Sequence, residues 1–430
     1  MRLFWLILWL VDLSAMAMEK ITIISPHRKS IQQEFVPAFQ DFYEKKHGKK
    51  IEVEWLDQGG TSDDVRFIRA RFKDNPKTSG IDLFWGGGAA AYMDLDAEKL
   101  LAPSPLPKGL RSQLPLTASG VPLSSPDKTW HSTAMSSFGI FYNKMILKMD
   151  GFKEPKTWQD LADPKLFGNI SLTDPRRSGS ANSLNNIILQ SLGFEKGFAV
   201  LTAISGNARS YTHSSSDPIK AVVSGDAAIA LAIDFYANSK IQDLGPDALG
   251  LTLPEAKTVL DPDPIAILKG APNVKGATEF VHYVLSSEAQ KMWMLPKGAK
   301  GGPKHSTIGR FSVNAKAYQE TDGQRVLTNP FKNNNFFPYD AQKASKLQRV
   351  LNDLVGATMI DSHGDLKKAW NRIRKDGVSE AELKAIGRSP VTEKELLALS
   401  EKWGDNVFRN KVINEWVAFS TEKYNSMGAH

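Results

Sequence analysis

The sequence contains no cysteine among its 430 residues. This absence excludes a disulfide framework, catalysis by a thiol and a lipid-modified N-terminal cysteine, and it is compatible with an oxidising compartment. Internal repeats and low-complexity tracts are also missing. With 41% hydrophobic and 23% charged residues, the chain has the composition of an ordinary globular protein. Its length suits two domains better than one.

A long apolar run occurs only at the N-terminus. Leu3 to Val11 follow Arg2, and Ala15-Met16-Ala17 forms the A-x-A pattern that precedes signal-peptidase cleavage. The alternative is a membrane helix, but the run is shorter than the roughly 20 residues that a span needs, and Asp12 interrupts it. We therefore predict a signal peptide that is cleaved near Ala17 and a free protein in the periplasm.

The motifs of common enzymes and of nucleic-acid binders are absent. No G-x-S-x-G, H-E-x-x-H or G-x-x-x-x-G-K-[ST] motif occurs. Gly86-x-Gly88-x-x-Ala91 fits the dinucleotide fingerprint loosely, but no acidic residue ends a second strand about 20 positions later. The net charge is +7, yet the densest basic run, residues 45–50, lacks interleaved aromatics and indicates a solvated helix end. We predict no catalysis, no cofactor, no metal site and no nucleic-acid partner.

Three strand-helix units follow the leader. Strand patterns occur at 21–24, 50–55 and 81–85. Each is followed by apolar residues at the spacing of a helix, at 31–42, 65–72 and 89–101 respectively. This alternation predicts an α/β lobe with a largely parallel sheet. Ligands of such sheets bind at the carboxyl ends of the strands, where the loops 25–27, 60–62 and 86–88 would lie.

A second lobe and a helical tail are predicted further along the chain. Residues 102–130 are rich in Pro, Ser and Gly and indicate a long surface connection. Strand patterns then recur, an apolar strand near 261 returns to the first lobe, and residues 277–294 resemble one helix. Helices are expected near 340–358, 364–375, 392–402 and 405–425, packed on the lobes or forming a docking surface. The expected organisation is a signal peptide (1–17), lobe 1 (18–134), lobe 2 (135–255), a return to lobe 1 (256–310) and a helical C-terminal region (311–430).

The stretch 174–182, DPRRSGSAN, combines two arginines with the start of a helix. Ser178, Gly179 and Ser180 would present free N–H groups and hydroxyls at the positive end of the helix dipole, and Arg176 or Arg177 would add charge. An ordinary N-cap is the alternative. Residues 214–217 form a further polar turn. Aromatic residues offer cavity walls or core packing: Trp85, Tyr92, Trp130, Phe138, Phe235 and Tyr236.

The order of these segments resembles a known family. ITIISPH, GGTSDDVRFI, GIDLFWGGG, SSFGIFYN, SLTDPRRSGSA, SSSDPIKAVVSGDAAIALAIDFYA and DPDPIAILKGAPN, spanning about residues 20–300, are similar to the periplasmic substrate-binding proteins of ABC importers. The subgroup includes ferric-ion, sugar-phosphate and aminoethylphosphonate binders. The resemblance implies the type II periplasmic-binding-protein fold, with two α/β lobes that each hold a mixed, largely parallel sheet flanked by helices. The long helical C-terminal region departs from the subgroup.

The resemblance also implies site residues. His27 and residues 234–236 match positions where iron-binding relatives place ligands, but Phe235 replaces a tyrosine, which disfavours ferric iron. Acids such as Asp234, Asp261 and Asp263, with the tryptophans, leave a polyamine as an alternative. The predicted ligand-binding residues are Ser25, His27, Gly60, Thr61, Ser62, Gly87, Ser136, Ser137, Arg177, Ser178, Gly179, Ser180, Asp234 and Tyr236.

The function expected from the sequence is solute capture. The two lobes would close over a small anionic solute bearing a phosphate, phosphonate or carboxylate, and the monomer would present it to ABC transporter permease subunits in the inner membrane. The alternatives are a ferric-ion or polyamine binder of the same fold, or a partner of a sensor receptor.

Overall fold

A computed structural model describes residues 18–427 except 119–120, 326, 328, 333–335 and 376. The predicted signal peptide, residues 1–17, lies outside the described residues. Within the described part, no helix combines the length and apolar character needed to cross a membrane.

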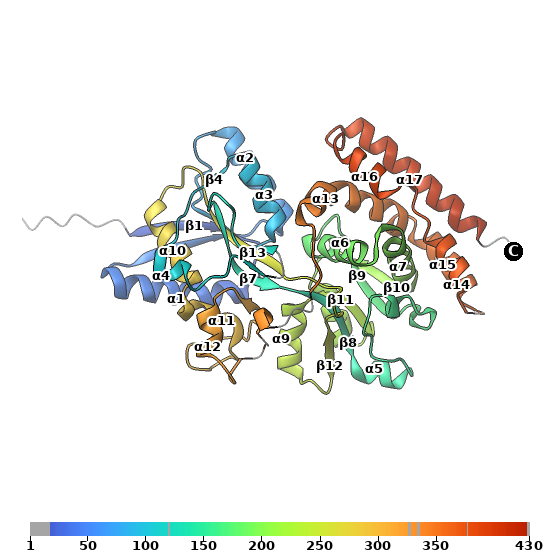
Figure 1. Ribbon diagram of the computed structural model, residues 1–430, viewed down its shortest axis with the longest axis horizontal. Coiled ribbons are helices and arrows are strands. Elements are labelled where there is room, and N and C mark those ends of the chain that lie inside the picture. Colours follow the sequence, from blue (N-terminus) through green and yellow to red (C-terminus); the bar gives the residue numbers. More distant parts are fainter. Residues whose placement is uncertain are drawn as a thin grey trace, which may run out of the picture.

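The chain forms two lobes, each built around one sheet (Figure 1). The first sheet has the order β14-β7-β13-β3-β1-β2 with β4 beside β13, and the second has the order β10-β9-β11-β8-β12. The predicted two-lobed α/β fold is confirmed. The strands are β1 (Glu19–Ile24), β2 (Ile51–Leu56), β3 (Leu83–Trp85), β4 (Leu101–Ala102), β5 (Thr117–Ala118), β6 (Val121–Pro122), β7 (Trp130–Ser136), β8 (Phe138–Asn143), β9 (Ile170–Thr173), β10 (Ala208–Thr212), β11 (Ile229–Ile233), β12 (Leu249–Thr252), β13 (Asp261–Leu268) and β14 (Phe311–Ser312).

Strand direction follows the connections. In the first sheet β1 pairs parallel with β2 and β3, and in the second β9 pairs parallel with β10 and β11, because a helix connects each strand to the next. The strands that pass between the lobes pair antiparallel with their neighbours, as β13 does with β3 and β7, and β8 with β11 and β12. The carboxyl ends of the parallel strands therefore face the other lobe, where the helices begin.

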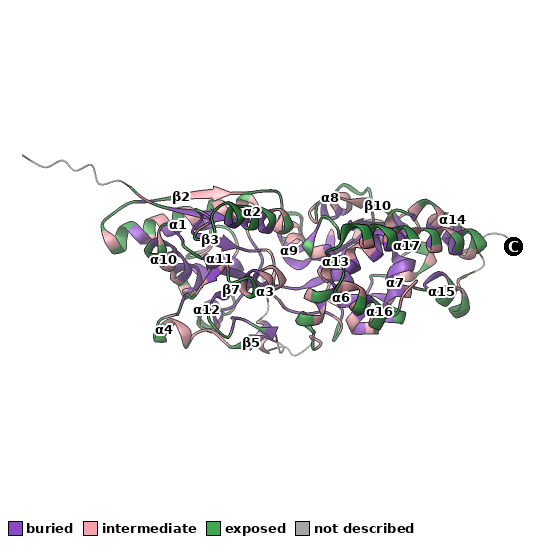
Figure 2. Ribbon diagram, turned by 90° about the horizontal axis from the view of Figure 1, so that it is seen from above, coloured by how far each residue is buried: buried purple, intermediate pink, exposed green. Residues whose placement is uncertain are grey.

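Helices cover both faces of the sheets, with their buried sides inward (Figure 2). The α-helices are α1 (Lys29–His47), α2 (Thr61–Asp74), α3 (Ala89–Ala97), α4 (Lys108–Arg111), α5 (Lys144–Met149), α6 (Gly179–Leu192), α7 (Phe194–Asn207), α8 (Asp217–Ser224), α9 (Asp234–Leu244), α10 (Val274–Leu285), α11 (Ser287–Met294), α12 (Ala315–Glu320), α13 (Ala341–Val355), α14 (His363–Ile373), α15 (Glu380–Ile386), α16 (Glu393–Ser400) and α17 (Asn406–Ser426). Shorter helical turns are η1 (Gln159–Ala162), η2 (Pro164–Leu166), η3 (Pro330–Lys332) and η4 (Gly356–Ile360).

Three connections between the lobes meet at Thr258. The first is Ser137, the single residue between β7 and β8, whose Oγ lies 3.3 Å from Oγ1 of Thr258 in the return segment. Thr258 also donates to the carbonyl of Phe138 at 2.6 Å and accepts the N–H of Phe337, which leads toward α13, at 3.1 Å. The hinge region between the lobes is thus a small hydrogen-bonded cluster.

The C-terminal helices pack mainly on the second lobe, beside α6 and α7 (Figure 1). Leu351 of α13, Trp370 of α14 and Trp416 of α17 are buried in the same apolar cluster as Ile187 and Ile204. The indole N–H of Trp370 donates to Oδ1 of Asn207 at 2.7 Å. The predicted helical C-terminal region is therefore confirmed.

Some element predictions were wrong. The helix expected to reach Leu101 ends at Ala97, because Leu101 pairs with β13 as β4. Residues 277–294 are not one helix, since Ser286 ends α10 and caps α11 with its side chain. Residues 102–130, expected to be a surface connection, contain α4 and the β5–β6 pair. Helix α15 was not predicted because its seven residues carry little apolar periodicity.

Candidate ligand-binding site

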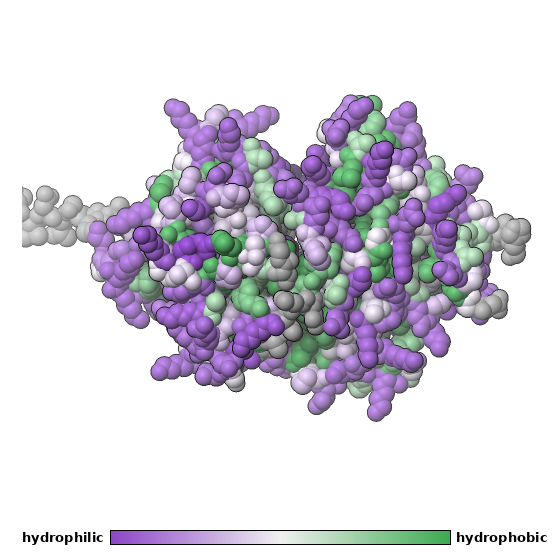
Figure 3. All heavy atoms as spheres, in the orientation of Figure 1, coloured by the Kyte–Doolittle hydropathy of each residue, from purple (hydrophilic) through white to green (hydrophobic). Residues whose placement is uncertain are grey.

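A cavity of about 290 Å³ lies between the lobes. This volume is close to the lower end of the roughly 300–1,000 Å³ that is typical of small-molecule sites. The space-filling view shows the surface notched between the two lobes (Figure 3). Both lobes and the beginning of α13 line the cavity.

Most of the predicted ligand-binding residues line this one cavity. The first lobe contributes the loops after β1, β2 and β3, and the second contributes the start of α6 and of α9. The predicted residues found in the wall are His27, Gly60, Thr61, Ser62, Gly87, Ser136, Arg177, Ser178, Gly179, Ser180 and Tyr236. Their contact with a solute stays a prediction.

Three predicted residues lie behind the wall, so their expected contact with a ligand needs correction. Ser25 is fully buried, and its Oγ accepts the N–H of His27 at 3.1 Å, which fixes the turn after β1. Ser137 is fully buried among the connections between the lobes. Asp234 is 1% exposed, and its Oδ1 accepts the N–H of Phe235 at the start of α9. Proximity to a strand end was predicted correctly, but the direction of the side chain was not.

Several helices begin at the cavity, and three of them point polar or small first-turn residues at it. The first turns of α2 and α3 come from the first lobe, and that of α6 comes from the second. The first N–H groups of a helix have no intrahelical acceptor and lie at the positive end of its dipole. The cavity is therefore supplied with backbone donors from two sides, an arrangement that favours an anion.

The start of α6 combines a cap with an open surface. Ser178 is the N-cap, and its Oγ accepts the N–H of Ala181 at 3.3 Å, so this hydroxyl serves the helix as the alternative interpretation expected. A Cβ placed on Gly179 would meet no atom within 4 Å, so the cavity is open beside its Cα. Gly179 and Ser180 thus remain available to a ligand.

The two arginines before α6 have different surroundings. Arg176 makes ion pairs with Asp174 and with Asp361 at the end of the η4 turn, both at 2.9 Å, and so ties α6 to the C-terminal region. Arg177 lines the cavity and has no ion-pair partner among the described residues. Of the two, Arg177 is the one placed to meet an anion.

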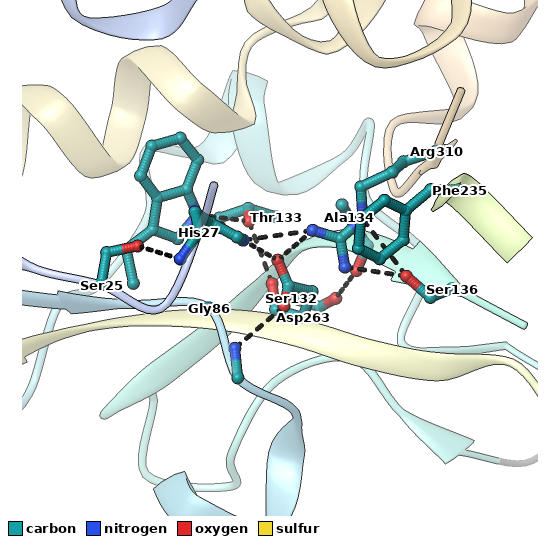
Figure 4. A network of polar contacts seen from close by, with 12 residues as sticks. Ser25, His27, Gly86, Ser132, Thr133, Ala134, Ser136, Phe235, Asp263 and Arg310 are labelled. Carbon is teal, nitrogen blue, oxygen red and sulfur yellow. Dashed lines mark hydrogen bonds and ion pairs between the residues drawn. The ribbon is translucent and has the colours of Figure 1, made fainter. Parts of the chain in front are cut away.

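A buried polar network forms the floor of the cavity on the first lobe (Figure 4). Oδ2 of Asp263 lies 2.7 Å from Nε2 of His27 and accepts from Nη1 of Arg310 at 2.8 Å. Arg310 also donates through Nη2 to Oγ of Ser136 at 2.8 Å. Oδ1 of Asp263 accepts the N–H of Gly87 at 3.1 Å. The network joins β1, β3, β7 and β13 to the segment before β14.

The network also sets the charges of its members. Burial raises the pKa of the Asp263 carboxyl, but Arg310 and then His27 outweigh it and hold the pKa well below its usual range. Burial lowers the pKa of His27, although Asp263 opposes the shift. The network therefore consists of an ionised aspartate paired with Arg310 and a neutral histidine.

Aromatic rings complete the wall beside this network. The guanidinium carbon of Arg310 lies over the ring of Phe235, 4.3 Å from the ring centroid. The same ring packs against Tyr236. The guanidinium of Arg28 lies 4.8 Å from the ring centroid of Tyr236. Such cation-π contacts keep the arginines in place. Phe138 lines the cavity too, whereas Trp85, Tyr92 and Trp130, which were offered as walls, are buried in the core of the first lobe.

Arg28 and Arg310 were missed by the sequence analysis. Arg28 directly follows His27 in the turn after β1, so its position was a usable indication. Arg310 belongs to no local pattern, and it reaches His27 and Asp263 only through the tertiary fold.

The cavity wall contains more cationic side chains than unpaired, ionised carboxylates. Asp263 is neutralised by Arg310, and Asp63 is paired with Arg66. Desolvation raises the pKa of Asp261 to about 7, and the charge of Asp263 adds to this rise while Arg310 opposes it. Arg28 and Arg177 remain without carboxylate partners among the described residues. The wall is thus net positive around neutral pH.

The glycine loop before α3 allows a close approach of three segments. Gly86 has a φ of +96°, and a Cβ at this position would lie 2.6 Å from the His27 ring. Gly87 has a φ of +100°, and its Cβ would lie 2.6 Å from Oγ1 of Thr61. Residues with side chains rarely adopt this backbone conformation. The loop therefore needs glycine for both its conformation and its packing.

We expect Gly87→Ala to lower the free energy of unfolding by about 1–3 kcal/mol, because it adds backbone strain and displaces Thr61. Urea titration of the ligand-free protein measures this. The matched control is Gly179→Ala, which lines the same cavity with ordinary φ and free space, and should change stability by less than about 0.5 kcal/mol. Equal effects of the two substitutions would contradict the assignment.

Comparison with known proteins identifies the family. Residues 38–303 match the family model described as bacterial extracellular solute-binding protein, which covers more than half of the chain. The chain belongs to this family. Solute-binding proteins bind their ligands without catalysis, so this family member is not an enzyme.

Curated relatives resemble this solute-binding protein over part of its length. The phosphoglycerate transport regulatory protein PgtC of Salmonella typhimurium is 26% identical over 242 residues, 56% of each chain. Iron uptake protein A1 of Synechocystis is 26% identical over 182 residues, which are 39% of this chain and 48% of that protein. The chain spans about half the length of the curated relatives it matches.

Solved structures share the fold. The periplasmic binding protein AfuA from Actinobacillus pleuropneumoniae, with fructose-6-phosphate bound, superimposes with a TM-score of 0.62 at 21% identity, covering 82% of this chain and 98% of that one. Apo ferric ion-binding protein A of Pasteurella haemolytica gives 0.57 at 16% identity, covering 78% and 96%. The type II periplasmic-binding-protein fold and the resemblance noted in the sequence are confirmed.

Proposed function

We propose that this solute-binding protein captures a small organic anion bearing a phosphate, phosphonate or carboxylate by closing its lobes. The observation that carries the proposal is the start of α6, where Arg177, Gly179 and Ser180 line the cavity. The first N–H groups of a helix have no intrahelical acceptor and so can bind an anion there. Thr61 and Ser62, at the start of α2, line the cavity from the other lobe. An anion between them would contact both lobes in the closed form, and this difference in contacts would drive closure.

The alternatives fit the wall less well. A ferric ion requires several anionic oxygen ligands, but His27 is engaged with Asp263 and the ring of Tyr236 lies beneath Arg28. Within the described residues, no group of three or more His, Cys, Asp or Glu is arranged to hold a metal ion. A polyamine requires free carboxylates, whereas Asp263 is already paired with Arg310.

The relatives include both phosphate-ester and iron binders by name, and two of them support the anion. One is named for phosphoglycerate transport, and a structural neighbour carries fructose-6-phosphate. We further infer that the protein is exported through its N-terminal segment, works as a monomer in the periplasm and delivers its solute to the permease subunits of an ABC importer in the inner membrane.

Sensing is a second candidate, favoured by the word "regulatory" in the name of the PgtC relative. A sensing partner would hand its closed form to a receptor instead of a permease. Deleting the gene would then abolish a transcriptional response to the solute while uptake continued, whereas a transport role predicts loss of uptake.

The ligand class is tested by thermal shift. The mature protein is unfolded, stripped of carried-over ligand and refolded, then heated with phosphoglycerate, fructose-6-phosphate, inorganic phosphate, ferric citrate or spermidine. A ligand at about 100 times its Kd stabilises by about 2.7 kcal/mol, which raises the midpoint visibly. We expect a shift with the organic phosphates. A shift confined to spermidine or ferric citrate would contradict the anion proposal.

We expect the Kd of wild type for an organic phosphate, divided by the Kd of Asp261→Asn at the same pH, to rise between pH 6 and 8. Asp261 lines the cavity with a pKa of about 7, so it is mostly neutral below that pH and gains a negative charge beside the solute above it. The expected loss is about tenfold relative to Asp261→Asn at the same pH. Taking the ratio of the two Kd values removes the titration of the solute's own phosphate. A ratio that stays constant or falls between pH 6 and 8 would contradict the titration of Asp261 beside the solute.

A further inference from the structure

Helix α13, from the C-terminal region, closes one side of the ligand cavity. Ala341, Ala344 and Gln348 line the cavity at spacings of three and four residues, which put them on one face of the helix. Leu347 and Leu351, on another face, are buried in the core of the second lobe. The helix is therefore anchored by its apolar side and presents a second face to the solute.

Side chains of both lobes hold α13 in this place. Nδ2 of Asn182, in the first turns of α6, donates to Oδ1 of Asn352 at 2.7 Å and to the backbone carbonyl of Gln348 at 3.3 Å. Across the cleft, Oγ of Ser345 donates to Oδ1 of Asp94 in α3 at 3.3 Å. The helix thus lies against the start of α6 and reaches the opposite lobe.

Among the α13 residues that line the cavity, Gln348 carries the one polar side chain. Ala341 and Ala344 carry only methyl groups, and no described residue provides a hydrogen-bond partner for the amide of Gln348. Lobe closure would remove water from this amide, and a buried amide requires partners for its donor and its acceptor. The helix ends and Arg177 already provide donors for an anionic group, so the amide is left for another part of the solute.

We propose that Gln348 is a specificity-determining residue that hydrogen-bonds the hydroxylated carbon skeleton of an organic phosphate, so that the C-terminal helical region forms part of the binding site. This inference rests on the proposed function because it concerns the same cavity. An uncharged amide favours a hydroxyl-bearing ester over bare phosphate, since inorganic phosphate offers no skeleton to contact.

The test compares Gln348→Ala with Gln342→Ala. Gln342 is the same residue type on the same helix, but it is exposed and lies outside the cavity wall. Calorimetry on stripped protein gives the Kd for phosphoglycerate, fructose-6-phosphate, inorganic phosphate, ferric citrate and spermidine. We expect Gln348→Ala to weaken the organic phosphate that binds wild type by about tenfold, to leave inorganic phosphate within about twofold, and Gln342→Ala to resemble wild type.

A second measurement does not depend on which probe binds. The natural chain has no cysteine, so Gln348→Cys and Gln342→Cys each create a unique thiol. The bound probe should slow alkylation at position 348 about fivefold or more and leave position 342 unchanged. Unchanged affinity in Gln348→Ala together with unprotected Cys at 348 would overturn the inference. If wild type binds spermidine or ferric citrate instead, the anion proposal fails, while the same comparison on that probe still decides whether α13 is a wall of the site.

Discussion

Replacing Arg310 by methionine should lower the free energy of unfolding by about 3–5 kcal/mol near pH 7. Arg310 and Asp263 are 3% and 7% exposed, and the substitution leaves an ionised carboxylate buried without its main partner. The ring of His27 and the N–H of Gly87 stay in contact with it, but burial of the ring still disfavours a charge on His27. Urea unfolding of the ligand-free protein measures the loss.

The loss should depend on pH. Asp263 has a depressed pKa in the folded wild type, so its contribution is present above the unfolded-state pKa of about 3.9 and disappears as pH falls toward the folded value. In the variant the pKa rises instead, and protonation relieves the penalty. The difference between the two proteins should therefore be largest near neutral pH. It should shrink as the pH falls through the raised folded-state pKa of Asp263 in the variant and on toward the depressed pKa in the wild type.

The matched control is Arg69→Met. Arg69 pairs with Glu98, but about two fifths of each side chain is exposed, so water replaces the lost partner. A cost of about 0–1 kcal/mol is expected. The double variant Asp263→Asn with Arg310→Met should recover part of the loss, because no charge is left buried. Equal costs at positions 69 and 310 would contradict the role given to burial.

The residues that could be predicted from the sequence are those whose position follows from local pattern. Thr61, Ser62, Gly179 and Ser180 stand between a strand pattern and a helix pattern, and the α/β fold brings such loops to the same edge of the sheet. Because side chains alternate along a strand, a one-residue difference separates Ser136, in the cavity wall, from Ser137, in the hinge region. The wrong prediction at Ser137 arose from that difference.

The remainder depends on contacts between distant segments. His27 is separated from Asp263 by 236 residues and from Arg310 by 283, and no periodicity connects them. The sequence indicated Asp263 as a turn residue or a polyamine ligand, whereas Arg310 neutralises it. The position of α13 is another such case, since its apolar spacing predicted packing without indicating that its other face borders the cavity.

Reversing the charge of Arg177 should have the largest effect on binding. Arg177→Glu is expected to weaken the organic phosphate that binds wild type on the order of a hundredfold, about 2.8 kcal/mol, because a favourable charge-assisted contact becomes repulsion. The matched control is Arg209→Glu on β10, which makes the same change in net charge at an exposed position outside the cavity wall. Its effect should stay within about threefold and vanish at high salt. Equal losses at both positions would mean that Arg177 acts only through the overall electrostatic field of the protein and not through contact with the solute.

Ser180→Asp separates anion binding from helix capping. Ser180 lies in the first turn of α6, where a carboxylate interacts favourably with the helix dipole and should stabilise the ligand-free protein by about 0.3–1 kcal/mol. The same carboxylate occupies the position proposed for the solute's anion, so affinity should fall at least tenfold. Stability and affinity are thus expected to change in opposite directions. If the start of α6 were only a helix cap, the substitution would raise stability and leave the Kd unchanged. An unchanged Kd would therefore contradict anion binding at this helix start.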